Sequence, residues 1–123
     1  MLVNLSNHPS TKWSVQQFEA AQVYGKVTDL PFPEVNPSGD EEYIRLLCDE
    51  YVKIIDGFGR DDARNISAIT VHIMGEMTFT FAMVSALQQK DISCIASTTQ
   101  RISSEANGVR TSEFQFVKFR EYH

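Results

Sequence analysis

Apolar and polar residues follow two periods along this chain, and the two periods alternate. Short runs of continuously apolar, β-branched residues are typical of strands buried on both faces, whereas apolar residues spaced three and four apart are typical of helices. The pattern predicts strands over residues 2–5, 26–30, 66–74 and 92–97. It predicts helices over residues 14–23, 40–59 and 76–90. The expected order is therefore strand, helix, strand, helix, strand, helix, strand.

Two of the expected helices have features that a structure can test. The first has apolar residues at roughly helical spacing, which is typical of a helix face packed against a core; they are Val15, Phe18, Ala21 and Val23. The second has Asp40 as its N-terminal cap. We expect it to end at the glycine-containing run of residues 56–59, because glycine favours the conformation that terminates helices.

After residue 97 the pattern becomes that of an antiparallel hairpin. Asn107 and Gly108 are the strongest short-range hairpin signal, and strand-forming runs lie on both sides of them. Alternating strands and helices require right-handed crossovers and a sheet covered on both faces. We therefore expect one α/β domain over residues 1–123, a small Rossmann-like or flavodoxin-like three-layer sandwich. Its sheet should be mostly parallel, with the hairpin as its antiparallel C-terminal part.

Composition and charge narrow the possible functions. The 123 residues have a formal net charge of −5, and 42% of them are hydrophobic, which is typical of a folded domain. No run reaches the roughly 18 apolar residues of a membrane span, and the N-terminus lacks the basic region of a signal peptide. The negative charge argues against binding to duplex DNA, although a small basic pocket can still hold a phosphate. We expect a soluble, cytoplasmic protein that does not bind membranes.

The cysteine and histidine content predicts no metal site. Cys48 and Cys94 lie in separate apolar segments, so we expect buried free thiols in a reducing compartment. No His, Asp or Glu residues have the spacing that is typical of zinc ligands. Neither a metal nor another cofactor is expected.

Candidate chemistry lies at the carboxyl ends of the strands. In an open α/β sheet, ligands bind where the strand order reverses, which for an order 2-1-3-4 lies between the first and third strands. The loops that leave these two strands are SNHPS and MGEMT. Six of their residues are expected to face one crevice, namely Ser6, Asn7, His8, Gly75, Glu76 and Thr78.

Several of these candidates also have a purely structural interpretation. Glu76 can cap the helix that follows it, or it can act as a base or accept a hydrogen bond from a ribose hydroxyl. His8 lies in a polar loop and is either an acid–base candidate or a turn residue, whereas His72 is expected in the core or at a subunit interface. A lone Gly75 falls short of the glycine-rich fingerprints of nucleotide sites, so dinucleotide binding is not expected.

A second polar group follows the fourth predicted strand, in the run STTQR. Thr98, Thr99 and Arg101 can hydrogen-bond a phosphate without a large positive charge. The alternative is an ordinary polar strand face, for which Thr is well suited. Arg110 and Glu105, across the expected hairpin, can form a cross-strand pair.

Three segments together resemble a known family. NLSNHPS, HIMGEMTFTFAMVSALQ and the pairing of ASTTQR with FVKFREY look like the small CRISPR-associated proteins of Rossmann-like fold, a group related to CARF domains that includes ring nucleases. The resemblance implies a homodimer that binds a cyclic oligoadenylate, the second messenger of type III CRISPR defence, at its two-fold axis. Some members of the group cleave this ring and so switch the response off.

The resemblance also implies a set of site residues. The ligand-binding residues would be Ser6, Asn7, Gly75, Thr78, Thr98 and Thr99, and the catalytic residues would be His8, Glu76 and Arg101. Cleavage without a metal uses the ribose 2′-hydroxyl as the nucleophile. His8 or Glu76 would deprotonate it, and Arg101 would stabilise the charge of the phosphorane. One departure from the family pattern is that the loops after the first and third predicted strands, SNHPS and MGEMT, hold no Lys.

Other functions remain open at this point. The protein can bind the ring without cutting it. The same fold can also serve as a non-enzymatic regulatory or scaffold module that dimerises through the hairpin and the edge FQFVKFREY. Finally, it can be an enzyme that acts on another nucleotide or on a phosphorylated metabolite in the same crevice.

Overall fold

The computed structural model describes residues 1–61 and 69–123. Its strands are β1 (Leu2–Ser6), β2 (Val27–Pro31), β3 (Thr70–Met74), β4 (Ser93–Ala106) and β5 (Val109–Glu121). Its helices are α1 (Val15–Ala21), α2 (Glu41–Asp61) and α3 (Met77–Gln88), with 3-10 turns η1 (Ser10–Lys12) and η2 (Gln22–Tyr24). Residues 66–68, the first part of the third predicted strand, lie outside the described residues. None of the described helices combines the length and the apolar character needed to span a membrane.

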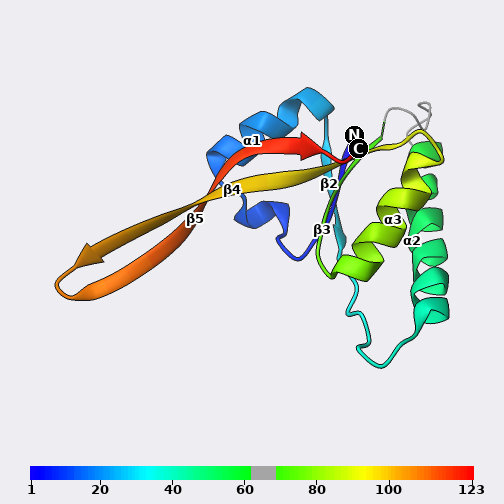
Figure 1. The fold of residues 1–123 in the computed structure, drawn as a ribbon. Helices are drawn as coiled ribbons and strands as arrows, with labels where there is room; N and C mark the ends of the chain where they lie inside the picture. The colour runs from blue at the N-terminus through cyan, green and yellow to red at the C-terminus, as the bar shows by residue number, and fades with distance from the viewer. Residues whose placement is uncertain (62–68) are drawn as a thin grey trace.

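The described strands form a five-stranded sheet in the order β2-β1-β3-β4-β5. β1 pairs in parallel with β2 and β3, β3 pairs in parallel with β4, and β5 is the antiparallel partner of β4. Figure 1 shows α2 and α3 on one face of the sheet and α1 on the other. The predicted fold class is therefore confirmed, a small Rossmann-like α/β sandwich with a C-terminal antiparallel hairpin.

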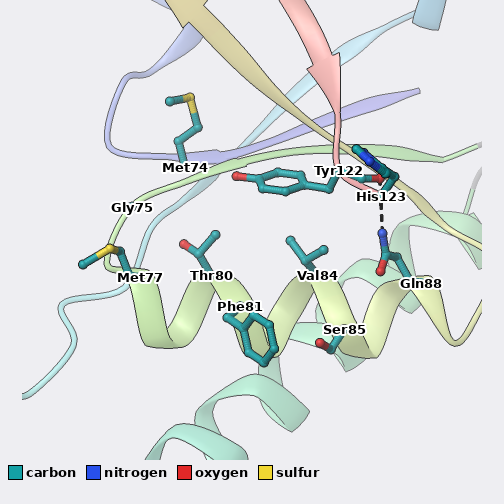
Figure 2. Close-up of a pocket in the computed structure, with 10 residues that line it drawn as sticks. All are labelled: Met74, Gly75, Met77, Thr80, Phe81, Val84, Ser85, Gln88, Tyr122 and His123. Carbon is teal, nitrogen blue, oxygen red and sulfur yellow. Dashed lines mark hydrogen bonds between the residues drawn. The ribbon is translucent and has the colours of Figure 1, made fainter.

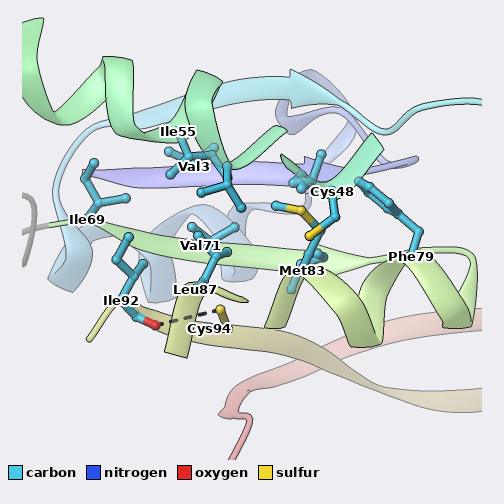
Figure 3. Close-up of a cluster of buried hydrophobic side chains, with 13 residues drawn as sticks. Val3, Cys48, Ile55, Ile69, Val71, Phe79, Met83, Leu87, Ile92 and Cys94 are labelled. Carbon is cyan, nitrogen blue, oxygen red and sulfur yellow. Dashed lines mark hydrogen bonds between the residues drawn. The ribbon is translucent and has the colours of Figure 1, made fainter. Parts of the chain in front are cut away.

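The face of the sheet under α2 and α3 is apolar (Figure 3). Alternate residues of β1 and β3 point to this face, because side chains alternate along a strand. Phe79 of α3 is fully buried there, edge-on to the rings of Phe32 and Tyr51 at centroid distances of 5.3 and 5.4 Å. The buried members of this main core are Val3, Leu5, Cys48, Val52, Ile55, Ile69, Val71, Ile73, Phe79, Met83, Leu87, Ile92 and Cys94.

Both cysteines lie in this core. Cys48 and Cys94 are buried free thiols, as predicted. Burial raises the pKa of Cys48, and it raises the pKa of Cys94 to about 12. Neither thiol is therefore in the reactive thiolate form at neutral pH.

Helix α2 begins as predicted but ends later. Asp40 caps it, because the Tyr43 N–H donates to Asp40 Oδ1 at 2.9 Å. The expected end at residues 56–59 is wrong, since the helix continues to Asp61. Phe58 packs against the main core. Its partial burial counteracts the cost of about 1 kcal/mol that each neighbouring glycine imposes on a helix.

The opposite face of the sheet, under α1, is built differently. Its apolar cluster is small and consists of Leu2, Trp13, Ala21 and Ile95, with three half-buried neighbours. The expectation that the apolar residues of the first helix face the core is confirmed for Ala21. It is wrong for Val15, Phe18 and Val23, which are exposed, and Val23 lies in the turn η2 that follows α1. The residue that α1 buries together with Ala21 is the polar Gln17. This helix is fitted to polar partners on the sheet.

Strands β4 and β5 continue beyond the rest of the sheet as a two-stranded arm (Figure 1). The sequence predicted a strand to residue 97 and a hairpin after it, whereas the structure joins the two in one strand, β4, which β5 pairs with from Ile95 to Ala106. Asn107 and Gly108 form the turn with φ angles of 54° and 76°, the positive values that a tight hairpin turn requires. The run STTQR therefore lies within a strand and not in a loop after it.

Candidate functional site

A groove of about 620 Å³ lies on the α1 face of the sheet. The loop after β1, helix α1 and parts of β3, β4 and β5 line it. The strand order reverses between β1 and β3, so the groove lies where ligands bind in open α/β sheets. This is the candidate functional site.

Five of the nine predicted site residues line the groove, namely Ser6, Asn7, His8, Gly75 and Thr99. They come from three segments that are far apart in the sequence and that the sheet brings together. The other four, Glu76, Thr78, Thr98 and Arg101, do not line it.

Glu76 is the N-terminal cap of α3. Its carboxylate accepts hydrogen bonds from the backbone N–H groups of Thr78 and Phe79, at 3.0 and 2.8 Å, and from the Thr78 hydroxyl. These bonds, the one from Phe79 above all, hold the pKa of Glu76 below its usual value. Both carboxylate oxygens are occupied at the helix terminus, which is the structural role that the sequence allowed for this residue.

Thr98 and Arg101 make contacts within the arm. The Thr98 hydroxyl donates to the Lys118 carbonyl oxygen at 3.0 Å and accepts from the Lys118 N–H at 3.2 Å. Arg101 donates to Ser112 Oγ at 3.0 Å. Because side chains alternate along β4, Arg101 lies on the same face of the arm as Thr99. It can therefore contact only a ligand that extends from the groove along the arm.

A series of hydrogen bonds links the sheet to α1 at the base of the groove. His72 Nδ1 lies 2.8 Å from Asn4 Oδ1, and His72 Nε2 lies 2.8 Å from Ser97 Oγ. Gln17 Nε2 donates to Ser97 Oγ at 3.1 Å. Asn4, His72 and Gln17 are buried, where an unpaired polar group costs about 1–3 kcal/mol. Each of these side chains thus depends on the others.

The partners of His72 determine which ring nitrogen carries the proton. The Asn4 amide nitrogen donates to Asp29 Oδ1 at 2.8 Å and to the His8 carbonyl oxygen at 3.0 Å, so the amide oxygen faces His72 as an acceptor. His72 Nδ1 therefore carries the proton, and Nε2 accepts from the Ser97 hydroxyl. Burial, and next the charge of His8, lower the pKa of His72 to about 4. The ring is neutral at physiological pH.

The backbone of His8 is held in place by the same network. Its carbonyl oxygen accepts hydrogen bonds from Asn4 Nδ2 at 3.0 Å and Trp13 Nε1 at 3.1 Å. The single Ser6 hydroxyl proton can go to Asn4 Oδ1 at 2.8 Å or to the same carbonyl oxygen at 3.2 Å. The loop after β1 is therefore fixed, and it carries the exposed His8 to the groove.

Aromatic side chains of β5 contribute to one wall of the groove. A bulge leaves Val117 without a partner in β4. This extra residue reverses the alternation of side chains, so Phe114, Phe116 and Phe119 all lie on the α1 side. The ring centroids of Phe116 and Phe119 are 5.0 Å apart. The side chain of Phe114 is 68% exposed and is open to solvent. The wall thus offers an accessible aromatic surface.

Lys12 of η1 brings a positive charge to the groove. SNHPS itself has no Lys, but the turn that follows it places Lys12 on the lining. Among residues 1–61 and 69–123, no carboxylate forms an ion pair with Lys12. Glu113 of β5 also lines the groove and is its acidic residue. In the part of the chain that the structure describes, no cluster of His, Cys, Asp and Glu is arranged to hold a metal ion.

A second pocket, of about 450 Å³, lies between α3 and the C-terminal residues (Figure 2). Its lining is mostly apolar and includes Met77 and Phe81, which are both exposed. The Tyr122 hydroxyl donates to the Ile73 carbonyl oxygen at 2.9 Å, and Gln88 Nε2 donates to the Tyr122 carbonyl oxygen at 3.2 Å. The exposed apolar side chains of this pocket suit contact with an apolar surface.

Sequence reasoning missed the buried half of the first site. His72 is buried, as predicted, but its polar partners were not expected, and Asn4 was not singled out. The two residues stand opposite each other in the register of β1 and β3. A usable signal was present, because Asn4 and Ser6 alternate with apolar residues and His72 does the same in β3. Gln17 gave no such signal, since a polar residue on a helix is usually exposed.

The sheet and the groove at its carboxyl edge define the chain as a small Rossmann-like α/β protein with a candidate ligand site. A family model described as the uncharacterized protein MJ1673 family matches residues 1–120. The chain therefore belongs to this family. Neither a curated protein nor a solved structure gave a significant match.

Proposed function

We propose that this chain is a cytoplasmic, CRISPR-associated protein that binds a cyclic oligoadenylate in the groove and opens the ring without a metal ion, acting as a homodimer. The observation that carries this proposal is the composition of the groove, which combines a lysine, a hydrogen-bonded His–Ser pair and an exposed aromatic ring. The segments that resemble CARF-related ring nucleases contribute residues to this groove.

The polar residues of the groove suit a phosphodiester. The Lys12 ammonium can pair with one phosphate charge, and the Asn7 amide and Thr99 hydroxyl can donate hydrogen bonds to its oxygens. A nucleoside triphosphate concentrates several negative charges on adjacent phosphates, whereas Lys12 brings a single ammonium to the lining to pair with them. The groove therefore favours a ligand with widely spaced single charges, as in an oligonucleotide.

The aromatic wall suits a nucleobase. Phe114 is open to solvent and lies two residues from Phe116 on the same side of β5, so an incoming base can stack on it. Glu113 can accept a hydrogen bond from an exocyclic amine, the group that adenine presents. These two contacts support an adenylate as the bound unit.

The size of the groove supports a dimer. Its volume of about 620 Å³ is that of an ordinary small-molecule site. A ring of several adenylates is larger than such a ligand, so one groove holds only part of it. A second copy of the chain, related by a two-fold axis, would hold the rest.

A non-enzymatic dimeric module is the second candidate function. It is favoured by Met77 and Phe81, which are exposed beside the second pocket and form an apolar patch of the kind that often marks protein contacts (Figure 2). On this alternative, the chain dimerises but no nucleotide stabilises it.

Binding and cleavage can be tested together. The protein is incubated with cyclic tri-, tetra- or hexa-adenylate in EDTA, with AMP and ATP as competitors, while thermal unfolding and products are followed. We expect one ring to raise the unfolding temperature and to be converted to linear products. Tighter binding of AMP or ATP than of any ring would favour an enzyme that acts on another nucleotide. A dimer whose unfolding temperature no nucleotide changes would favour the non-enzymatic module.

Matched variants connect the ligand to the groove. Lys12→Ala and Phe114→Ala should each weaken ring binding by about tenfold or more, because a charge-assisted contact or a stacked base is lost. Lys53→Ala on the exposed side of α2 should leave binding unchanged, and Phe114→Trp should retain it. Equal binding by Lys12→Ala and Lys53→Ala would contradict the proposed groove.

A further inference from the structure

We propose that Ser97 and His72 together form the general base of the groove, with Asn4 as the residue that orients His72. In this inference, which rests on the proposed function, Ser97 Oγ takes the proton of the ribose 2′-hydroxyl and passes its own proton to His72 Nε2. It assigns to this pair the role that the sequence suggested for His8 or Glu76.

The three side chains are arranged in the order that a proton transfer requires. Asn4 Oδ1 accepts from His72 Nδ1 at 2.8 Å, and His72 Nε2 accepts from Ser97 Oγ at 2.8 Å. A hydroxyl, a base that accepts its proton and a third group that fixes the base are the common elements of activated hydroxyl sites. Here they come from three adjacent strands, β1, β3 and β4, whose pairing sets their positions.

Of the three hydrogen-bonded side chains, Ser97 is the one that a ligand can reach. His72 is only 2% exposed, whereas Ser97 is half-buried and lines the groove. The Ser97 oxygen has two lone pairs, and Gln17 Nε2 occupies one of them at 3.1 Å. The second lone pair is left to accept a hydrogen bond from a ligand hydroxyl. His72 therefore acts through Ser97.

The alternative base at the end of β3 is already engaged in capping α3. Glu76 accepts hydrogen bonds with both carboxylate oxygens at the start of α3. It also lies outside the lining of the groove. A phosphodiester bound in the groove would further favour the Ser97–His72 pair, because a nearby negative charge stabilises the protonated form of His72.

The reaction balances with the residues of the groove alone. The ribose 2′-oxygen forms a bond to phosphorus as its proton moves to Ser97 Oγ and the Ser97 proton moves to His72 Nε2. The bond from phosphorus to the 5′-oxygen breaks, and the leaving oxygen takes a proton from the Lys12 ammonium. The products are a 2′,3′-cyclic phosphate and a 5′-hydroxyl, and no water or oxidant is consumed. His72 and Lys12 then return to their starting states by proton exchange with solvent.

The test separates binding from cleavage in four variants. Ser97→Ala removes the hydroxyl, and His72→Gln keeps an oxygen that can accept from Ser97 but that does not take up a proton. Both should lower the single-turnover rate of ring opening by about 100-fold or more, the range of general acid–base catalysis, while the Kd changes less than about threefold. Ser97→Thr should recover part of the rate. Ser93→Ala is the matched control, because Ser93 Oγ lies on the same strand but bonds to Glu121 at 3.2 Å.

Each outcome has a distinct meaning. Wild-type rates in Ser97→Ala or His72→Gln would overturn the base assignment and leave the proposed function in place. Ring binding without cleavage by the wild-type protein would also overturn it, while ring binding itself would stand. Absence of binding by any cyclic oligoadenylate would overturn both proposals. Equal losses of binding and rate in these variants would show a structural role for the pair and would count against it.

Discussion

The two faces of the sheet are made from the same strands but hold opposite kinds of residues. Along β1, Val3 and Leu5 face α2 and α3 in the main core, whereas Asn4 and Ser6 lie on the α1 side among hydrogen-bonded side chains. The first face is packed with apolar groups, and the second exchanges hydrogen bonds with a short helix. The difference indicates that the first face stabilises the fold, which leaves the second face able to hold polar chemistry.

The largest effect should come from the apolar face. Phe79→Ala removes a fully buried ring from between Phe32 and Tyr51, so the free energy of unfolding should fall by about 3–5 kcal/mol. Urea denaturation measures this value. Phe81→Ala, on the exposed side of the same helix, should change it by less than about 0.5 kcal/mol. Similar losses in both variants would contradict the view that the buried side of α3 carries the stability of the apolar face.

The polar face should make stability depend on pH. The pKa of His72 is about 4 in the folded chain and near 6.5 in the unfolded chain. Protons therefore favour the unfolded chain. The contribution of His72 to the free energy of unfolding is complete above pH 6.5. It is lost as the pH falls from 6.5 through 4, by up to about 3 kcal/mol.

Denaturation at several pH values in His72→Gln isolates this contribution. Protonation of carboxylates with lowered pKa values, such as Glu76, also makes the fold less stable in acid, but it does so equally in the wild type and in His72→Gln. The difference between wild type and variant should therefore change between pH 6.5 and 4. A constant difference would mean that His72 is not buried in its neutral form.

A smaller effect is expected where α1 meets the sheet. Gln17→Ala leaves Ser97 Oγ without its amide donor, so stability should fall by about 1–3 kcal/mol. Thermal unfolding together with urea denaturation measures the change. An unchanged stability would mean that solvent replaces the amide, and that the polar face is wetter than its burial indicates.

The smallest effect is expected on the outer side of α1. Val15→Ser should change stability by less than about 0.5 kcal/mol, since Val15 is exposed although its spacing is that of a core residue. A loss of 1 kcal/mol or more in a urea titration would indicate that Val15 is covered in solution, by another copy of the chain for example. The pair Gln17 and Val15 thus tests whether α1 binds the sheet through its polar side.

The sequence predicted the parts of the fold that depend on local chemistry. The Asp40 and Glu76 caps, the Asn107-Gly108 turn and the alternation of strands and helices all follow from short-range preferences. The continuity of the fourth strand with the hairpin was not predicted, because it depends on pairing with β5, which a single segment does not reveal.

The candidate site was only half predictable for a related reason. Ser6, Asn7, His8 and Gly75 could be found because loops after parallel strands meet at one edge of a sheet. Asn4, His72 and Gln17 acquire their roles only through partners on other elements, at 2.8 to 3.1 Å. Their residue types alone are equally compatible with an ordinary core or surface.

The unpaired Val117 decides which surface of the arm is aromatic. Side chains on a strand alternate with a period of two. If Val117 paired with a residue of β4, Phe114 and Phe116 would lie on the surface opposite Phe119, away from the groove. Because Val117 is left out of the pairing, deleting it would keep Lys118 opposite Thr98 and Phe116 opposite Thr99, with both rings still on the groove side. The aromatic surface of the arm therefore comes from the residue that the strand omits from pairing, and not from an aromatic residue at every second position.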